Sequence, residues 1–212
     1  AIIGQKNLAV LIVPTRCAKT NTERLPVEPL ERSPMPSSHE SLLCQYRYDA
    51  LDRLIGHEPT GSPQSQRFYC KSRLATEIQG ALQQSIVQYG DWLLAQQQRQ
   101  GDVLDATLLS TDQQRSLLHT VKANHLTHSF AYSPYGHHRA ESGLLSLLGF
   151  NGERPDPVTG NHLLGNGYRA FSPVLMRFNS PDSLSPFEKG GLNSYGYCQG
   201  DPVNKSDPTG HL

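Results

Sequence analysis

The sequence predicts an all-β protein built from stacked β-hairpins. Short apolar stretches alternate with polar residues, and turns rich in Gly and Pro recur about every eight to twelve residues in the C-terminal half. A hairpin-like pattern also returns along the chain, which is typical of repeat architectures. The 212 residues are 36% hydrophobic with a mean hydropathy of -0.50, so we expect only a small core.

The first hairpin is predicted over residues 43–56. Residues 43–48 alternate with the two-residue period of a strand, Ala50-Leu51-Asp52 forms the bend, and 53–56 returns. The segment Arg67–Ala75 repeats this plan, with aromatic residues, a polar turn and then Arg-Leu. We therefore expect each hairpin to stack on the next one.

Further short strands are predicted between turn signals. Gly90-Asp91 suits a tight two-residue turn between strands at 85–89 and 92–95, with Gln96–Gln100 as a polar tip. Residues 112–122 fit either a strand or one to two helical turns. The remaining strands are predicted at 103–109, 117–121, 129–132, 163–164, 168–171, 175–178 and 193–198.

Residues 1–40 differ from the rest of the chain. Five prolines between Pro14 and Pro36 interrupt a polar stretch, which predicts an irregular or linker segment. Leu8–Val13 is a possible short strand and is far too short to span a bilayer. The first residue, Ala1, is not an initiator Met, so the natural N-terminus of the protein is expected to lie upstream.

Charge and cysteine spacing exclude several functions. Lys plus Arg and Asp plus Glu both number 19, which favours neither nucleic acid nor an anionic membrane as a partner. The four cysteines form no C-x-x-C pair, so we expect free buried thiols, no metal site and no cofactor. Gly165–Ala170 matches G-x-G-x-x-A, but Pro173 follows too soon for the helix of a dinucleotide site.

Aromatic and histidine side chains carry weaker signals. Trp92 and the tyrosines are expected to pack against the sheet rather than bind a ligand. His137-His138 is expected in a solvated loop, because neighbouring side chains on a strand point to opposite faces.

Two Asp-Pro dipeptides near the C-terminus are the candidate catalytic residues. Asp201 and Asp207 flank a predicted turn, and if that turn folds back their carboxyl groups can share a proton. Such a pair supplies an acid and a base to activate water against a peptide carbonyl. Asp156 in Asp156-Pro157 is a second candidate acid. The alternative is that these dipeptides are ordinary turn residues.

Residues 132–212, from Tyr132-Ser133-Pro134 to the end, resemble the RHS repeat-associated core domain of bacterial RHS/YD-repeat proteins. Tyr46-Arg47-Tyr48-Asp49 followed by Arg53-Leu54 resembles the YD repeat itself, whereas the copy at 67–75 has Cys70 in place of Asp. The resemblance implies three parts: a segment at 1–40 outside it, degenerate YD-repeat hairpins at 41–131, and the core domain at 132–212.

The family's fold implies a structural role for the chain. Its YD-repeat sheet winds into a hollow spiral shell, and the core domain closes one end. A chain of this length is too short to enclose a cargo, so we expect an open sheet with unpaired edges.

The resemblance also implies single-turnover self-cleavage. In related proteins an aspartate pair cuts the chain after a DPxG-type motif, with the help of an arginine. Asp201 and Asp207 would form the pair here, with Arg177 as the first choice for the arginine and Arg169 as the second. The motif reads Asp207-Pro208-Thr209-Gly210-His211-Leu212, and the extra His211 leaves the position of the cut bond open near Leu212.

The family suggests partners and a location. These are the rest of the shell, a C-terminal toxin absent from this sequence, and a secretion-system or toxin-complex subunit, with neither nucleic acid nor a membrane span. The protein would be cytoplasmic before export and then secreted, displayed on the cell surface or delivered by a secretion apparatus. The alternative is a non-catalytic scaffold or cell-surface binding fragment.

Overall fold

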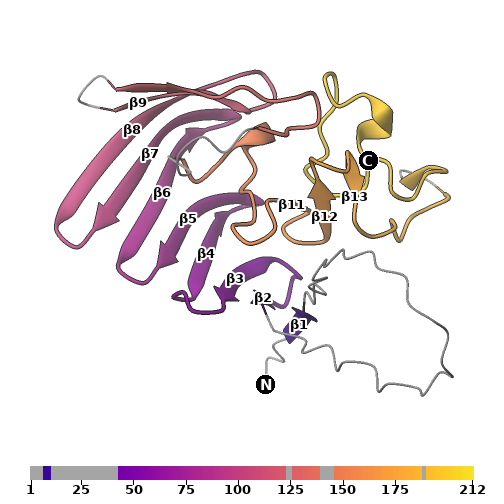
Figure 1. Cartoon of the computed structure of the whole chain (residues 1–212), viewed down its shortest axis with the longest axis horizontal. Helices are drawn as coiled ribbons and strands as arrows, with labels where there is room; N and C mark the ends of the chain where they lie inside the picture. Colours follow the sequence, from indigo (N-terminus) through magenta and orange to yellow (C-terminus); the bar gives the residue numbers. More distant parts are fainter. Residues whose placement is uncertain (1–6, 11–42, 123–125, 139–145, 188–189) are drawn as a thin grey trace, which may run out of the picture.

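The computed structural model describes residues 7–10, 43–122, 126–138, 146–187 and 190–212. These residues form an almost entirely β structure, which confirms the predicted fold class (Figure 1). Most of the predicted 1–40 segment lies outside the described residues, apart from a strand at Asn7–Val10.

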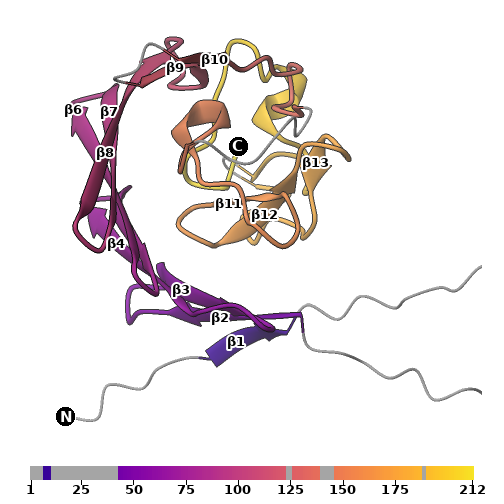
Figure 2. The same cartoon turned by 60° about the vertical axis from the view of Figure 1, so that its left-hand side comes forward.

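Ten strands form one antiparallel sheet in which every strand pairs with its neighbours in sequence. The strands are β1 (Asn7–Val10), β2 (Cys44–Tyr48), β3 (Leu54–Pro59), β4 (Ser65–Cys70), β5 (Arg73–Gln79), β6 (Leu82–Tyr89), β7 (Trp92–Gln100), β8 (Val103–Thr111), β9 (Leu117–Lys122) and β10 (Thr127–Ser129). Figure 2 shows this sheet curving in an arc, with the C-terminal part of the chain on its concave side.

The C-terminal part is smaller and less regular. It contains a three-stranded sheet of β11 (His162–Leu164), β12 (Arg169–Ser172) and β13 (Arg177–Phe178), and short 3-10 turns at Phe150–Gly152 and Cys198–Gly200. Three small apolar clusters hold the structure together. One joins the inner face of β6–β9 to Leu147 and Leu148, one lies within the C-terminal part, and one lies at β2–β3.

The residues that resemble the YD repeat form the hydrogen bonds of the first hairpin's turn. The Oδ1 of Asp49 accepts hydrogen bonds from the backbone N–H groups of Leu51 and Arg53, both at 2.9 Å. Its Oδ2 accepts from the Arg53 guanidinium at 2.7–2.8 Å. The aspartate and the arginine four residues later therefore close the bend between β2 and β3 from both sides.

The second copy of this pattern uses its arginine differently. Cys70 offers no carboxylate to Arg73, whose guanidinium instead donates to the Gly90 carbonyl and pairs with the Asp91 carboxylate. Gly90-Asp91 is the predicted tight turn, closed by the Tyr89–Trp92 pair of β6 and β7. Arg73 thus links one hairpin to the turn of the next.

Several predicted boundaries are wrong. Gln96–Gln100 is not a polar tip but the second half of β7, because its backbone pairs with both β6 and β8. Residues 112–116 form a turn before β9, and the chain leaves the sheet after Ser129. Residues 193–198 are turns and bends rather than a strand.

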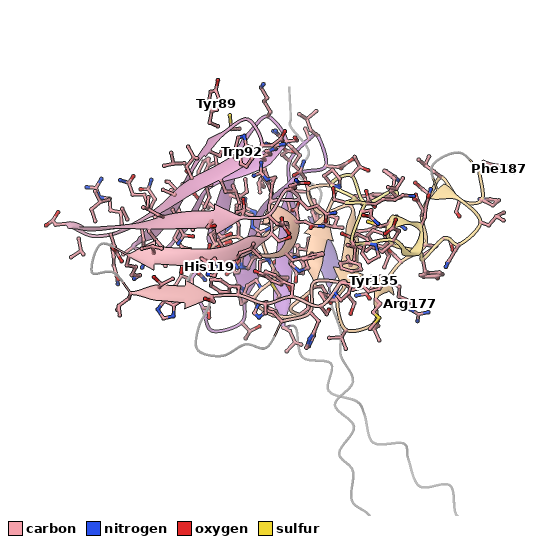
Figure 3. All side chains as sticks on the ribbon, turned by 90° about the horizontal axis from the view of Figure 1, so that it is seen from above. Tyr89, Trp92, His119, Tyr135, Arg177 and Phe187 are labelled. Atoms are coloured by element: carbon pink, nitrogen blue, oxygen red, sulfur yellow. The ribbon has the colours of Figure 1, made fainter. Side chains whose placement is uncertain are left out.

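The prediction that Trp92 packs against the sheet is also wrong. Its side chain is 62% exposed and projects with Tyr89 from the rim of the sheet (Figure 3). The pleat explains this, because successive side chains along a strand point to opposite faces, and Leu93, next to Trp92, takes the buried position. Tyr46, in contrast, is buried as expected.

Candidate functional site

The last six residues of the chain return to the surface of the small sheet. Gly165, in the turn between β11 and β12, lets this segment approach closely, since a Cβ there would lie 2.3 Å from the Thr209 carbonyl oxygen. The Gly165 N–H donates to the Pro208 carbonyl at 3.2 Å. The Gly165–Ala170 motif therefore begins with a tight turn and not with a helix, as the sequence predicted. The C-terminal segment packs against this turn.

Asp207 organises this segment from its buried position. Its Oδ1 accepts from the Thr209 N–H at 3.2 Å, the Thr209 hydroxyl at 2.9 Å and the His211 N–H at 3.1 Å. Its Oδ2 accepts from the Leu212 N–H at 2.6 Å. The carboxylate thus folds residues 207–212 around itself, with one oxygen against the Leu212 peptide.

A second buried carboxylate, Asp182, contacts the same segment. Its Oδ1 lies 2.8 Å from the His211 Nδ1, and its Oδ2 lies 3.2 Å from an Arg169 Nη2. Burial alone would raise the pKa of Asp182, but hydrogen bonds from the Leu184 N–H and from His211, together with the charge of Arg169, hold it below the ordinary value. Asp182 is therefore ionised at neutral pH.

Arg169 links Asp182 to the backbone of the C-terminal segment. Its Nε donates to the Gly210 carbonyl and its Nη1 to the Ser194 carbonyl at 3.0 Å, so each of the three guanidinium nitrogens has an acceptor. The Phe178 ring lies under the guanidinium, with its centre 3.6 Å from the Cζ atom. These contacts hold the buried guanidinium in place.

The main-chain oxygen of Leu212, the last residue of the sequence, accepts a backbone hydrogen bond. The Cys198 N–H, in the 3-10 turn, donates to it at 2.7 Å. Leu212 also lines a cleft of about 610 Å³ together with Tyr135, Arg177 and Tyr195. Figure 3 shows Tyr135 and Arg177 close together at this edge of the molecule.

The residues predicted as the catalytic set are not all brought together. Asp201 hydrogen-bonds Asn204 at 2.9 Å, and no hydrogen bond among the described residues joins Asp201 to Asp207. Arg177 is exposed, with its guanidinium 5.8 Å from the Tyr195 ring centre. Arg169, the second choice, is the arginine that contacts the C-terminal segment.

Asp156, the further candidate acid, lies at a different place. Its Oδ2 accepts from the Tyr46 hydroxyl at 3.0 Å and from Thr159, which ties the C-terminal part to β2. Gly160 closes this turn with φ 70°.

The sequence reasoning missed Asp182. In the sequence it is a single Asp after Ser180-Pro181, and no local spacing relates it to His211, twenty-nine residues later. The local sequence shows only that Asp182 follows a Ser-Pro dipeptide four residues after the end of the short strand β13.

Neither a cluster of metal-ligating side chains nor a long apolar helix occurs in the part of the chain that the structure describes. None of its His, Cys, Asp and Glu side chains form a group of three or more suited to hold a metal ion. None of its helices is long and apolar enough to cross a membrane.

The fold and the site define a class of protein: a curved sheet of sequential β-hairpins that encloses its own C-terminal segment. The family model of the Teneurin YD-shell matches residues 35–203, and the chain therefore belongs to this family. No curated protein matches the chain. The chain is a structural segment of a YD shell.

Solved structures share the fold. The crystal structure of TcdB2-TccC3 without the hypervariable C-terminal region matches with a TM-score of 0.59 and 18% identity, over 79% of this chain and 9% of that one. The crystal structure of TcdB2-TccC3-TEV matches with a TM-score of 0.58 and 16% identity, over 84% and 9%. The chain thus spans about a tenth of the length of these proteins, which have the RHS/YD-repeat fold.

Proposed function

We propose that this chain is the closing segment of an RHS toxin-delivery shell and cuts the peptide bond that follows Leu212 once, to release a C-terminal toxin. The observation that carries the proposal is the pair of buried carboxylates, Asp182 and Asp207, on either side of the Gly210–Leu212 segment. The matched TcdB2-TccC3 crystal structure lacks a hypervariable C-terminal region of that protein, and such a region fits a variable cargo. The proposed location is a secreted or delivered particle, and its partners are the remaining shell and a toxin-complex or secretion subunit.

The proposed chemistry is hydrolysis by an acid and a base. Asp182, ionised beside Arg169, takes one proton from a water molecule as its oxygen attacks the Leu212 carbonyl carbon. The Cys198 N–H stabilises the negative charge that develops on the carbonyl oxygen. Asp182 then passes the proton that it has taken from water to the departing amide nitrogen, and the C–N bond breaks to leave a carboxylic acid and an amine. Asp207 holds the Leu212 peptide in position by accepting its N–H.

The cleft beside Leu212 supports cleavage at the peptide bond that follows this residue. It is lined by Tyr135, Arg177 and Tyr195 and opens next to the Leu212 carbonyl, where the first residue of a released segment would lie. In this proposal Arg177 contacts the departing chain, whereas Arg169 positions Asp182 and the Gly210 carbonyl.

The test is the intact mass of the chain carrying a short peptide tag after Leu212. We expect loss of the tag in the parent and a fall in cleavage rate of about 10²–10⁴-fold in Asp207→Asn and in Asp182→Asn. Asp201→Asn is the matched comparison, because Asp201 also precedes a Pro but bonds only within its own turn. Circular dichroism of each variant reports whether the fold is kept.

Each result has a distinct meaning. Normal cleavage in Asp201→Asn with none in Asp182→Asn supports the pair that the geometry favours, and the reverse supports the Asp201–Asp207 pair. A tag that stays attached in the folded parent as firmly as in Asp207→Asn contradicts self-cleavage. The protein would then be a non-catalytic scaffold or cell-surface binding fragment.

A further inference from the structure

A polar cavity lies between the inner face of the large sheet and the C-terminal part of the chain. Its volume is about 320 Å³, and its walls come from β4 and β5, from the turn before β9, and from residues near 148–154 and 206–208. The share of one water in the liquid is about 30 Å³, so the space holds a small ion together with several waters.

Four arginines line this cavity, and two of them have unused donors. The four are Arg67, Arg73, Arg115 and Arg154. The Arg67 side chain is only 5% exposed, and its Nη2 is buried without a hydrogen-bond partner while its Nε bonds Glu77. Arg115 donates its Nη2 to Gln88 at 3.0 Å, and its Nη1 is likewise buried and unpaired. Buried guanidinium N–H groups without acceptors are costly, which points to a missing acceptor.

The carboxylates around the cavity are mostly committed elsewhere. Glu77 accepts from Arg67 and from two nitrogens of Arg154 at 2.9–3.2 Å. Asp91 pairs with Arg73 at the exposed turn, and Asp207 is occupied by its own backbone donors. Glu153 is the remaining acid, and no hydrogen bond to its carboxyl group is recorded among the described residues.

We propose that this cavity binds a small oxyanion, of the class of inorganic phosphate or sulfate, through the unpaired Nη atoms of Arg67 and Arg115. Guanidinium groups match the oxygens of such anions in charge and geometry. The anion would bridge two places in the large sheet, since Arg67 belongs to β4 and Arg115 to the turn between β8 and β9, whose side chain lies against Gly152 of the C-terminal part. The cavity has Asp207 in its wall, but the arginines proposed to hold the anion, Arg67 and Arg115, take no part in the proposed self-cleavage.

Glu153 sets the pH dependence of this site. Burial raises the pKa of Glu153 to about 7; the charges of Arg115, Arg67 and Arg73 oppose the rise and that of Asp207 adds to it. Arg154, Asp91 and Tyr69 also face the cavity, and Glu77 lies behind Arg67. Protonation of Glu153 removes a competing negative charge, so anion binding tightens as the pH falls through about 7.

The experiment measures the thermal unfolding midpoint of the whole chain in rising concentrations of phosphate or sulfate, with chloride at matched ionic strength. A ligand that binds only the folded state raises the midpoint in a saturable way. We expect this rise in the parent and in Arg99→Gln, whose arginine is exposed on β7 away from the cavity. In Arg115→Gln the apparent affinity should fall at least about tenfold, as for a lost charged hydrogen bond.

The variant Glu153→Gln distinguishes a change in anion affinity from a folding defect. It should bind sulfate, whose own charge does not change in this pH range, more tightly than the parent at pH 8, and its affinity for sulfate should no longer change with pH near 7. Isothermal titration calorimetry with sulfate checks both points in any variant that keeps the parent's circular dichroism. The same midpoint in phosphate and in chloride for the parent, or equal shifts in Arg115→Gln and Arg99→Gln, would overturn the proposal.

Discussion

Two buried histidines make the stability of the folded protein depend on pH in the acid range. His57 is fully buried, with its Nδ1 2.6 Å from the Ser65 hydroxyl, and His162 lies between the rings of Phe150 and Phe171. Burial lowers the pKa of both histidines to about 4, below the ordinary value of 6.5. The unfolded chain therefore binds more protons than the folded chain between these values, and stability falls as the pH drops from about 6.5 towards 4.

Glu153 acts in the opposite sense. Its raised pKa means that the folded state takes up a proton first, so its contribution to stability grows as the pH falls from about 7 to about 4.5. Two histidines outweigh one glutamate, and the net effect of acid in this range is destabilising.

We predict that His162→Phe flattens the acid side of the stability profile. The change removes one of the two groups that must gain a proton on unfolding, which corresponds to on the order of 2–3 kcal/mol of the difference between pH 7 and pH 4. Urea unfolding at a series of pH values measures this slope. His119→Gln is the control, because His119 is exposed on β9, and an unchanged slope in His162→Phe would contradict the assignment.

At the scale of elements, the pleat of each strand and the bulges that interrupt it decide which side chains reach the core. In β7, Leu93 and Gln96 are three residues apart and both buried, because the pairing register with β6 shifts here and leaves the exposed Leu94 as the extra residue. The Gln96 Oε1 accepts from the Leu147 N–H at 2.6 Å and from the Ser146 hydroxyl at 3.1 Å. One strand thus supplies both an apolar contact and a polar contact to the C-terminal part.

Adjacent leucines on β7 provide a matched pair of substitutions. Leu93→Ala should lower the free energy of unfolding by about 2–5 kcal/mol, because it leaves a cavity in the cluster with Ile86 and Leu147. Leu94→Ala should stay within about 0.5 kcal/mol, because its side chain is 47% exposed. Chemical denaturation measures both, and equal losses would show that the register of β7 is shifted.

At the scale of the whole molecule, a buried ionic cluster joins the curved sheet to the C-terminal part. Glu77 of β5 pairs with Arg67 of β4 and with Arg154. Burial alone would raise the pKa of Glu77, but its hydrogen bonds and the charges of Arg154 and Arg67 hold it below the ordinary value. Removing one partner of such a cluster leaves buried charges unpaired.

We predict that Glu77→Gln destabilises the protein by about 3–5 kcal/mol. Because the cluster spans both parts, the C-terminal part should loosen first, and hydrogen exchange should rise in residues 146–172 before it rises in β7 and β8. Glu58→Gln is the control, since Glu58 is exposed on β3. A uniform rise in exchange over the whole chain would contradict the linking role.

The order of the hairpins along the chain and the residues of their turns could be predicted from the sequence alone. Alternating side chains predict strands, Gly90-Asp91 predicts a tight turn, and Asp49 with Arg53 marks the first bend, because all of these act over a few neighbouring residues. The long β7 was underestimated, since its glutamines look like a surface loop when the pairing strands are unknown.

Only the tertiary structure decided which groups meet. Asp201 is six residues from Asp207, yet the carboxylate that contacts the same segment is Asp182, and the arginine that contacts it is Arg169 rather than Arg177. No pattern in the sequence predicted that Arg67 and Arg115 line the same cavity. These contacts depend on how the sheet curves around the C-terminal part, and no local pattern encodes the meeting of residues so far apart along the chain.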